Sequence, residues 1–163
     1  MHLIGNLWFL WIFGNNVEDS MGHGRFLIFY LLCGLVAAGS HIATDPSSPV
    51  PMVGASGAIS GIMGAYLVLY PRARVHTLII LIIIPRVFQL PAWFFLIYWL
   101  ALQLASSAVR GQGGGGGVAF WAHIGGFVAG VALVKIFQNR VLVAAKHSGR
   151  QVQRAELRGR GWW

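Results

Sequence analysis

Charged residues are scarce in this sequence, and acidic residues are the scarcest of all. Only 4 residues are Asp or Glu, against 12 Lys and Arg, while 56% of the chain is hydrophobic. A chain of this composition has too few polar side chains to cover the surface of a soluble globule, so the composition excludes an ordinary soluble domain. The single cysteine, Cys33, excludes an internal disulfide, and its apolar surroundings favour a packing role.

Apolar stretches, in contrast, are long and frequent. A hydrocarbon core of about 30 Å requires roughly 20 mostly apolar residues per helix. Five stretches approach this length, over residues 1–17, 26–43, 53–70, 91–109 and 118–137. We therefore predict an all-α polytopic membrane protein. Its membrane domain covers residues 1–137, and a basic tail covers residues 138–163.

Two other segments break this pattern. The run LIILIII at residues 78–84 is too short to span, and Pro85 and Arg86 follow it. We interpret it as a re-entrant or interfacial piece, with a strand-like hairpin as the alternative because β-branched residues dominate. The glycine run GQGGGGG at residues 111–117 holds no regular element and predicts a mobile loop.

The basic residues predict the orientation of the spans. With the connections counted from the five spans, every Lys and Arg except Arg110 falls on the side that carries the C-terminus. By the positive-inside rule that side is cytoplasmic. We attribute the basic tail to topology and to anionic lipid rather than to nucleic acid. Five crossings then put Met1 outside, and no signal peptide is recognisable. We therefore expect the chain to lack an earlier crossing.

Polar side chains inside the predicted spans are costly to desolvate, and four of them stand out. His2 and Asn6 are four residues apart and share one helical face. Ser56 lies in the third span and His123 in the last. Taken alone, each is explained by helix packing or by an interhelical hydrogen bond. All four nevertheless lie in the outer half of their spans, and this agreement in depth favours a common site.

Small residues accompany both Ser56 and His123. They recur at spacings of three or four along one face of each span: Gly57, Gly61 and Gly64 in the third, Ala122, Gly126 and Gly130 in the last. Such faces let two helix backbones approach closely. If the two faces pack together, Ser56 and His123 come within hydrogen-bond reach.

The chemistry of this group is that of a serine nucleophile. A serine hydroxyl needs a base to be activated, and His123 can take its proton and return it to a leaving amine. The Ser56 backbone N–H, the Asn6 amide and the His2 imidazole are candidate donors to an oxyanion. The spans contain no carboxylate to orient His123, so we predict a dyad rather than a triad. We expect no cofactor, and we disfavour a metal site of His2, His41 and His123 because no short-range ligand pair occurs.

In this arrangement the sequence resembles the rhomboid intramembrane serine proteases. HLIGN is similar to the His-x-x-x-Asn of the second rhomboid helix, and FGNNVEDSMG to the Phe-Gly…Glu-x-x-x-Gly that follows it. GASGAISG resembles the Gly-x-Ser-Gly of the fourth helix, LPAWFFLIYWLALQL the fifth, and AHIGGFVAG the sixth. The resemblance covers roughly residues 1–137. It implies a rhomboid-like bundle with five of the usual six transmembrane helices, the first being absent.

The resemblance also implies a role for each site residue. Ser56 would be the nucleophile and His123 the general base, with the oxyanion held by His2, Asn6 and the Ser56 backbone. The glycines implied in packing at the site are Gly54, Gly57, Gly61, Gly126 and Gly130. The loop after Arg110 would cap the site. In the family the first helix and its loop support the site, so a chain without them is expected to lose activity or stability.

One residue departs from the family pattern. Ser60 stands where many members carry an aromatic ring that stacks on the catalytic histidine, and Trp121 is a candidate substitute. The implied substrates are transmembrane proteins in a bacterial inner membrane, cut near its outer boundary in a helix that can unwind. Two alternatives stay open: an inactive rhomboid-like protein that binds membrane clients, and a small transporter or channel. The presence of both Ser56 and His123 argues against the first, and the absence of inverted repeats against the second.

Overall fold

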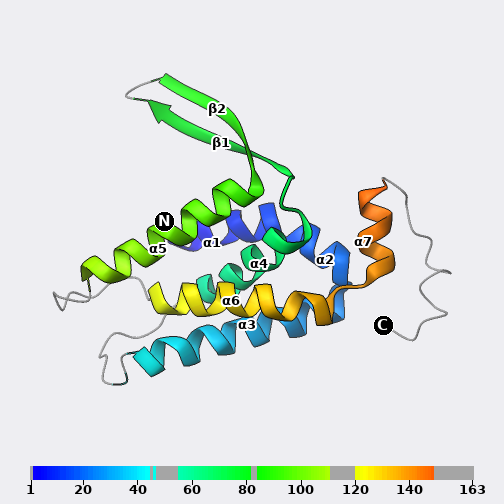
Figure 1. Ribbon diagram of the computed structural model, residues 1–163, viewed down its shortest axis with the longest axis horizontal. Coiled ribbons are helices and arrows are strands. Elements are labelled where there is room, and N and C mark those ends of the chain that lie inside the picture. Colours follow the sequence, from blue (N-terminus) through cyan, green and yellow to red (C-terminus); the bar gives the residue numbers. More distant parts are fainter. Residues whose placement is uncertain (1, 45, 47–54, 82–83, 111–119, 149–163) are drawn as a thin grey trace.

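The structure is a computed structural model that describes residues 2–44, 46, 55–81, 84–110 and 120–148. Most of these residues are helical (Figure 1). The helices are α1 (His2–Phe9), the π-helical segment η1 (Leu10–Gly14), α2 (Asn15–Met21), α3 (His23–Thr44), α4 (Ser56–Leu69), α5 (Ala92–Arg110), α6 (Phe120–Phe137) and α7 (Arg140–His147). Gly54, the glycine run at residues 111–117 and the last part of the tail lie outside the described residues.

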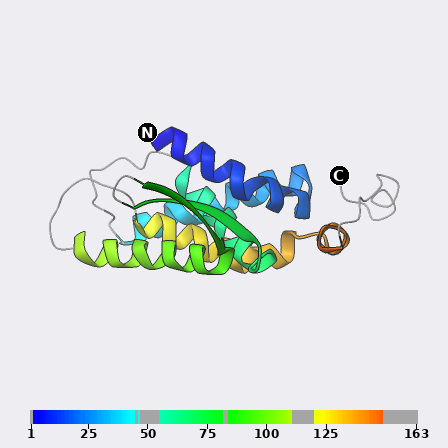
Figure 2. The same ribbon diagram turned by 90° about the horizontal axis from the view of Figure 1, so that it is seen from above.

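Each predicted span contains a helix, and the helices alternate in direction. α4 and α6 begin at the end of the bundle where α3 and α5 finish, as Figures 1 and 2 show from two sides. α1 also begins at this end. We call it the Ser56 end, because Ser56 is the first residue of α4. Alternating directions are expected of a chain that crosses a membrane several times, because it must turn back after each crossing.

The first helical run is longer than predicted and is not uniformly α-helical. α1, η1 and α2 follow one another without a break, and the run ends at Gly22, whose φ of 88° suits glycine. The π-helical turn places Phe13 in the core, where its ring centroid lies 5.0 Å from that of Tyr66 on α4. The run from α1 to α2 therefore packs along one side of α4.

α4 is the central helix of the bundle. Every residue from Gly57 to Tyr66 is buried, against neighbours on α3, α6 and η1. The outer helices instead expose large apolar side chains, among them Leu27, Leu31 and Leu35 on α3 and Trp93 and Tyr98 on α5. A bundle with an apolar exterior and a core of small residues is the arrangement expected in lipid, where packing rather than hydrophobic burial joins helices.

Two helices, α3 and α6, are long and apolar enough to cross a membrane by themselves. α4 has 14 residues, and the apolar part of α5, Ala92–Ser106, is also shorter than a full span. α1 has 8 residues before its π-helical continuation. The number of five spans therefore stays a prediction, although the position of each helix agrees with the sequence analysis.

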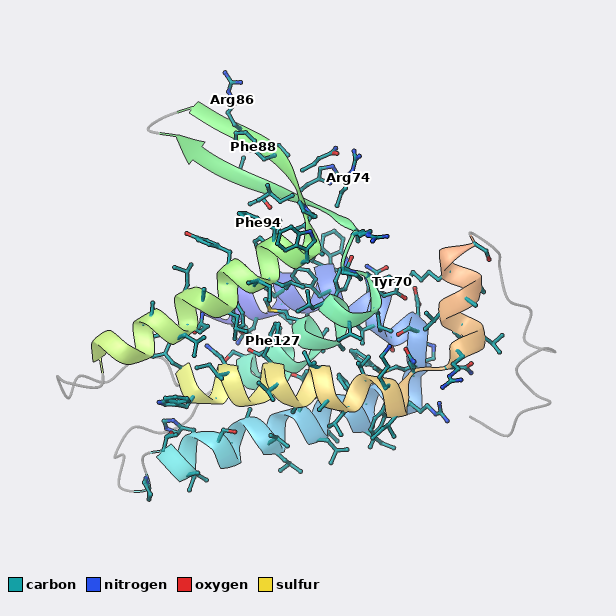
Figure 3. All side chains as sticks on the ribbon, viewed as in Figure 1. Tyr70, Arg74, Arg86, Phe88, Phe94 and Phe127 are labelled. Carbon is teal, nitrogen blue, oxygen red and sulfur yellow. The ribbon has the colours of Figure 1, made fainter. Side chains whose placement is uncertain are left out.

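The segment between α4 and α5 is a β-hairpin, which was the alternative interpretation of the LIILIII run. β1 (Arg74–Leu81) pairs antiparallel with β2 (Ile84–Pro91). Pro85 is tolerated because each strand of a two-stranded ribbon keeps one unpaired edge. The hairpin leaves the bundle where α4 ends and α5 begins, and Arg86 projects from it away from the helices (Figures 1 and 3).

The predicted tail contains a short helix that docks on the bundle. The Asn139 side chain caps α7 by accepting a hydrogen bond of 3.0 Å from the Val141 N–H. The Asn139 N–H donates to the Ser20 carbonyl at 2.8 Å, and Lys146 Nζ lies 2.5 Å from Asp19 Oδ2. α7 thus packs against α2, at the end of the bundle opposite Ser56.

Candidate active site

Ser56 and His123 are in direct contact across the interface between α4 and α6. His123 Nε2 lies 2.9 Å from Ser56 Oγ, although the two residues are 67 positions apart in the sequence. His123 is in the first turn of α6 and is only 7% exposed, and Ser56 is half-buried. A buried imidazole nitrogen at hydrogen-bond distance from a hydroxyl is the geometry that general-base activation of a serine requires.

Glycines make this contact possible by letting the two backbones touch. A Cβ atom on Gly126 would overlap the carbonyl oxygen of Gly57, and one on Gly130 would overlap that of Gly61. On the α3 side, a Cβ on Gly57 would lie 2.6 Å from the Cβ of Ala37. At these positions the interface has no room for a residue larger than glycine. A side chain as short as serine can reach the neighbouring helix only at such a separation.

The second ring nitrogen of His123 faces α5. His123 Nδ1 lies 2.9 Å from Oε1 of Gln103. The sequence analysis gave Gln103 no role, although a polar residue inside an apolar span was the signal that could have identified it.

An aromatic ring does lie beside His123, but it is Trp99. The ring centroids of Trp99 and His123 are 5.8 Å apart, with an interplanar angle of 45°. Trp99 also stacks at 6.2 Å on Phe127, which is labelled in Figure 3. The sequence suggested a substitute ring such as Trp121, whereas the ring that the structure places beside His123 comes from α5; Trp121 is 45% exposed.

Ser60 occupies the core without contributing an aromatic ring. It is 1% exposed, and its hydroxyl donates a hydrogen bond of 2.8 Å to the carbonyl oxygen of Ser56. This i to i−4 bond satisfies the hydroxyl within α4. Ser60 therefore supports the first turn of α4, directly beneath the candidate nucleophile.

The start of α4 also provides backbone donors. The first intrahelical bond at this end runs from the Ile59 N–H to the Ala55 carbonyl at 3.0 Å. The N–H groups of Ser56, Gly57 and Ala58 come before it and have no acceptor within the helix, as at any helix N-terminus. This end also carries the positive pole of the helix dipole. Negative charge that forms beside Ser56 would be stabilised there.

The other predicted site residues are only partly placed. Asn6 lies on α1, which contacts α4, and its side chain is half-buried. His2 begins α1, and its side chain is outside the described part of the structure. Among the described residues, no three His, Cys, Asp or Glu side chains gather as a metal-binding group.

Comparison with known proteins identifies the family of the chain. The sequence model of the Rhomboid domain matches residues 1–140. The chain belongs to the rhomboid family. It is 38% identical over 138 residues to rhomboid protease GluP of Bacillus subtilis, an alignment of 81% of this chain and 23% of that protein. It is 28% identical over 136 residues to the mitochondrial rhomboid protein 1 of Saccharomyces cerevisiae, covering 80% of this chain and 36% of that protein.

The chain thus spans well under half the length of either rhomboid relative. No solved structure matches it. Family membership, together with the two spanning-length helices α3 and α6, makes it an integral membrane protein. The exposed apolar side chains of its outer helices accordingly face lipid.

Proposed function

We propose that this rhomboid protein is an intramembrane serine endopeptidase that cleaves transmembrane segments of other membrane proteins. The observation that carries the proposal is the 2.9 Å separation of His123 Nε2 and Ser56 Oγ. Family membership and the similarity to a protein named rhomboid protease support it. A protein that only binds membrane clients has no need of a buried imidazole aimed at a serine hydroxyl.

In the proposed reaction Ser56 and His123 act in two half-reactions. Ser56 Oγ attacks a peptide carbonyl carbon while His123 Nε2 takes its proton, and the carbonyl oxygen becomes an oxyanion. The N–H groups at the start of α4, with Asn6 and His2, would hold that oxyanion. His123 then gives its proton to the leaving amine, and an acyl-serine remains. Water, activated by His123 in the same way, releases the new carboxylate and restores Ser56.

The length of α4 sets the depth of this chemistry. Its 14 residues measure roughly 21 Å at about 1.5 Å per residue, short of a hydrocarbon core of about 30 Å. With the end of α4 at one membrane surface, Ser56 lies below the other, and water must reach it there. A regular substrate helix hides its carbonyl groups, so the proposed substrates contain a segment that unwinds, such as one with Gly or Pro.

The proposed orientation follows from the distribution of basic residues. The Ser56 end faces the outside and the C-terminus faces the cytoplasm, because Lys135, Arg140 and Lys146 all lie at the opposite end. The proposed location is the bacterial inner membrane. The proposed partners are transmembrane substrates and the bilayer itself.

The test is cleavage of a single-span reporter by the full chain in membranes. Ser56→Ala and His123→Ala are each expected to abolish cleavage and labelling by a serine-reactive fluorophosphonate. Ser40→Ala is the control, because it removes a serine hydroxyl beside α6 that donates within α3, to the Val36 carbonyl at 2.9 Å. Retained cleavage in both site variants would refute the proposal. Loss of cleavage in the control as well would mean that the assay reports folding rather than chemistry.

A further inference from the structure

The two ring nitrogens of His123 face two different partners. Nε2 lies 2.9 Å from Ser56 Oγ on α4, and Nδ1 lies 2.9 Å from Gln103 Oε1 on α5. A neutral imidazole carries one proton, so one nitrogen donates and the other accepts. Only the form with its proton on Nδ1 leaves a lone pair on Nε2 to receive the proton of Ser56. The partner of Nδ1 therefore decides whether His123 can act as the base.

Gln103 suits this position because its oxygen can only accept. When Oε1 faces the ring, the proton must be on Nδ1. The amide could in principle turn its NH2 group toward His123, but after proton transfer from Ser56 both ring nitrogens carry protons and both donate. At that stage only the oxygen of Gln103 makes a hydrogen bond to Nδ1. The reaction itself thus favours the orientation that the structure shows.

We propose that Gln103 is a positioning residue that fixes the tautomer and the ring orientation of His123, in place of the carboxylate of a triad. The inference rests on the proposed function and deepens it. A carboxylate at this depth would carry a charge that is costly in the membrane. An amide oxygen accepts the same hydrogen bond without that charge. His123 can therefore be oriented even though the predicted spans contain no acidic residue.

Trp99 completes the support from the same helix. It lies four residues before Gln103, so the two side chains share one face of α5. Its ring packs against the imidazole while Gln103 holds Nδ1. α5 therefore limits the ring of His123 both in position and in rotation.

The first test is kinetic, in the full chain and with the single-span reporter. Gln103→Leu removes the acceptor at similar size and is expected to lower kcat roughly 10- to 100-fold with KM unchanged, because a buried N–H loses its partner. Gln103→Glu restores an acceptor oxygen and is expected to recover activity with a new dependence on pH, since only its ionised form is purely an acceptor. Leu102→Ala, on the lipid-facing side of α5, is the control and should behave as wild type.

The second test observes the proton directly and does not depend on turnover. Nitrogen-15 NMR of labelled histidine in the purified protein distinguishes the two tautomers, and a His123→Ala sample identifies the His123 signals. Wild type is expected to carry its proton on Nδ1, and Gln103→Leu to give a mixture. A wild-type proton on Nε2, or wild-type kcat in Gln103→Leu, would overturn the proposal. Cleavage that survives Ser56→Ala would instead overturn the proposed function and leave the tautomer result intact.

Discussion

Gly126 of α6 lies against the carbonyl oxygen of Gly57 of α4, with no room between them for a methyl group. This backbone contact is within one turn of the pair of Ser56 and His123 on each helix. The separation of the two helices, and with it the 2.9 Å distance between Oγ and Nε2, therefore depends on a hydrogen atom in place of a side chain at this position.

Replacing Gly126 by alanine is expected to separate the helices and abolish cleavage. Overpacking of this kind costs about 1–3 kcal/mol of stability, and a shift of about 1 Å at reacting atoms lowers a rate about 100-fold. Reporter cleavage and denaturant unfolding in detergent measure the two effects. Gly39→Ala on α3 is the control, because a Cβ there meets nothing within 4 Å. Equal behaviour of the two variants would contradict the close packing.

Introducing an aromatic ring at position 60 is expected to harm the protein rather than improve it. Ser60 is almost fully buried, and Trp99 already supplies the ring beside His123. Ser60→Tyr therefore overpacks the core at a cost of about 1–3 kcal/mol. Ser60→Ala loses one intrahelical hydrogen bond and is expected to stay within about 1 kcal/mol of wild type. Unfolding measurements on both variants check this. Faster reporter cleavage by the Ser60→Tyr variant would show that the core has room for an aromatic ring at position 60.

Trp99→Ala is expected to lower activity by loosening His123. The half-buried indole contacts both His123 and Phe127, so its removal costs roughly 2 kcal/mol of packing. Trp99→Phe keeps a ring in place and should retain most of the activity. Trp93→Ala is the control for Trp99→Ala, because Trp93 lies on the same helix and is 49% exposed. If Trp93→Ala and Trp99→Ala reduced kcat equally, the contact with His123 would not be the cause.

α7 is expected to be separable from the chemistry. Asn139→Ala removes the cap of α7 and costs about 1 kcal/mol of local stability. Lys146→Ala breaks a partly exposed ion pair worth about 0–1 kcal/mol. Limited proteolysis within residues 140–147 should become faster in Asn139→Ala, while reporter cleavage stays at the wild-type rate. A parallel loss of cleavage would connect this end of the bundle to the Ser56 end.

The positions of the helices could be predicted from the sequence because apolar length and flanking polar residues determine them locally. The predicted span at residues 26–43 agrees with α3 (His23–Thr44), and the span at 118–137 with α6 (Phe120–Phe137). The hairpin could be given only as an alternative, since a short β-branched run suits either a strand or an interfacial segment. α7 was not foreseen because it is short, and its docking depends on contacts with Ser20 and Asp19, which are distant from it in the sequence.

At the candidate site, matched depth predicted the meeting of Ser56 and His123, and the structure brings them together; their catalytic roles stay predictions. The depth of Gln103 in its predicted span could not reveal its contact with His123, because that contact depends on which face of α5 turns toward α6. Helix geometry disfavours Trp121 as the ring that stacks on His123. Residues two positions apart on a helix point to nearly opposite sides, so Trp121 could not lie over His123. The ring found beside His123, Trp99, comes from α5.

The β-hairpin between α4 and α5 has two kinds of surface with opposite requirements. Both of its outer edges expose backbone N–H and C=O groups that hydrocarbon cannot satisfy. Its exposed Leu78 and Val87 side chains, however, are poorly suited to water. Figures 1 and 2 show the ribbon slanting from the junction of α4 and α5 back toward the Ser56 end, so it does not lie in a single layer across the bundle axis. Its surroundings must therefore offer both polar and apolar contacts along that length.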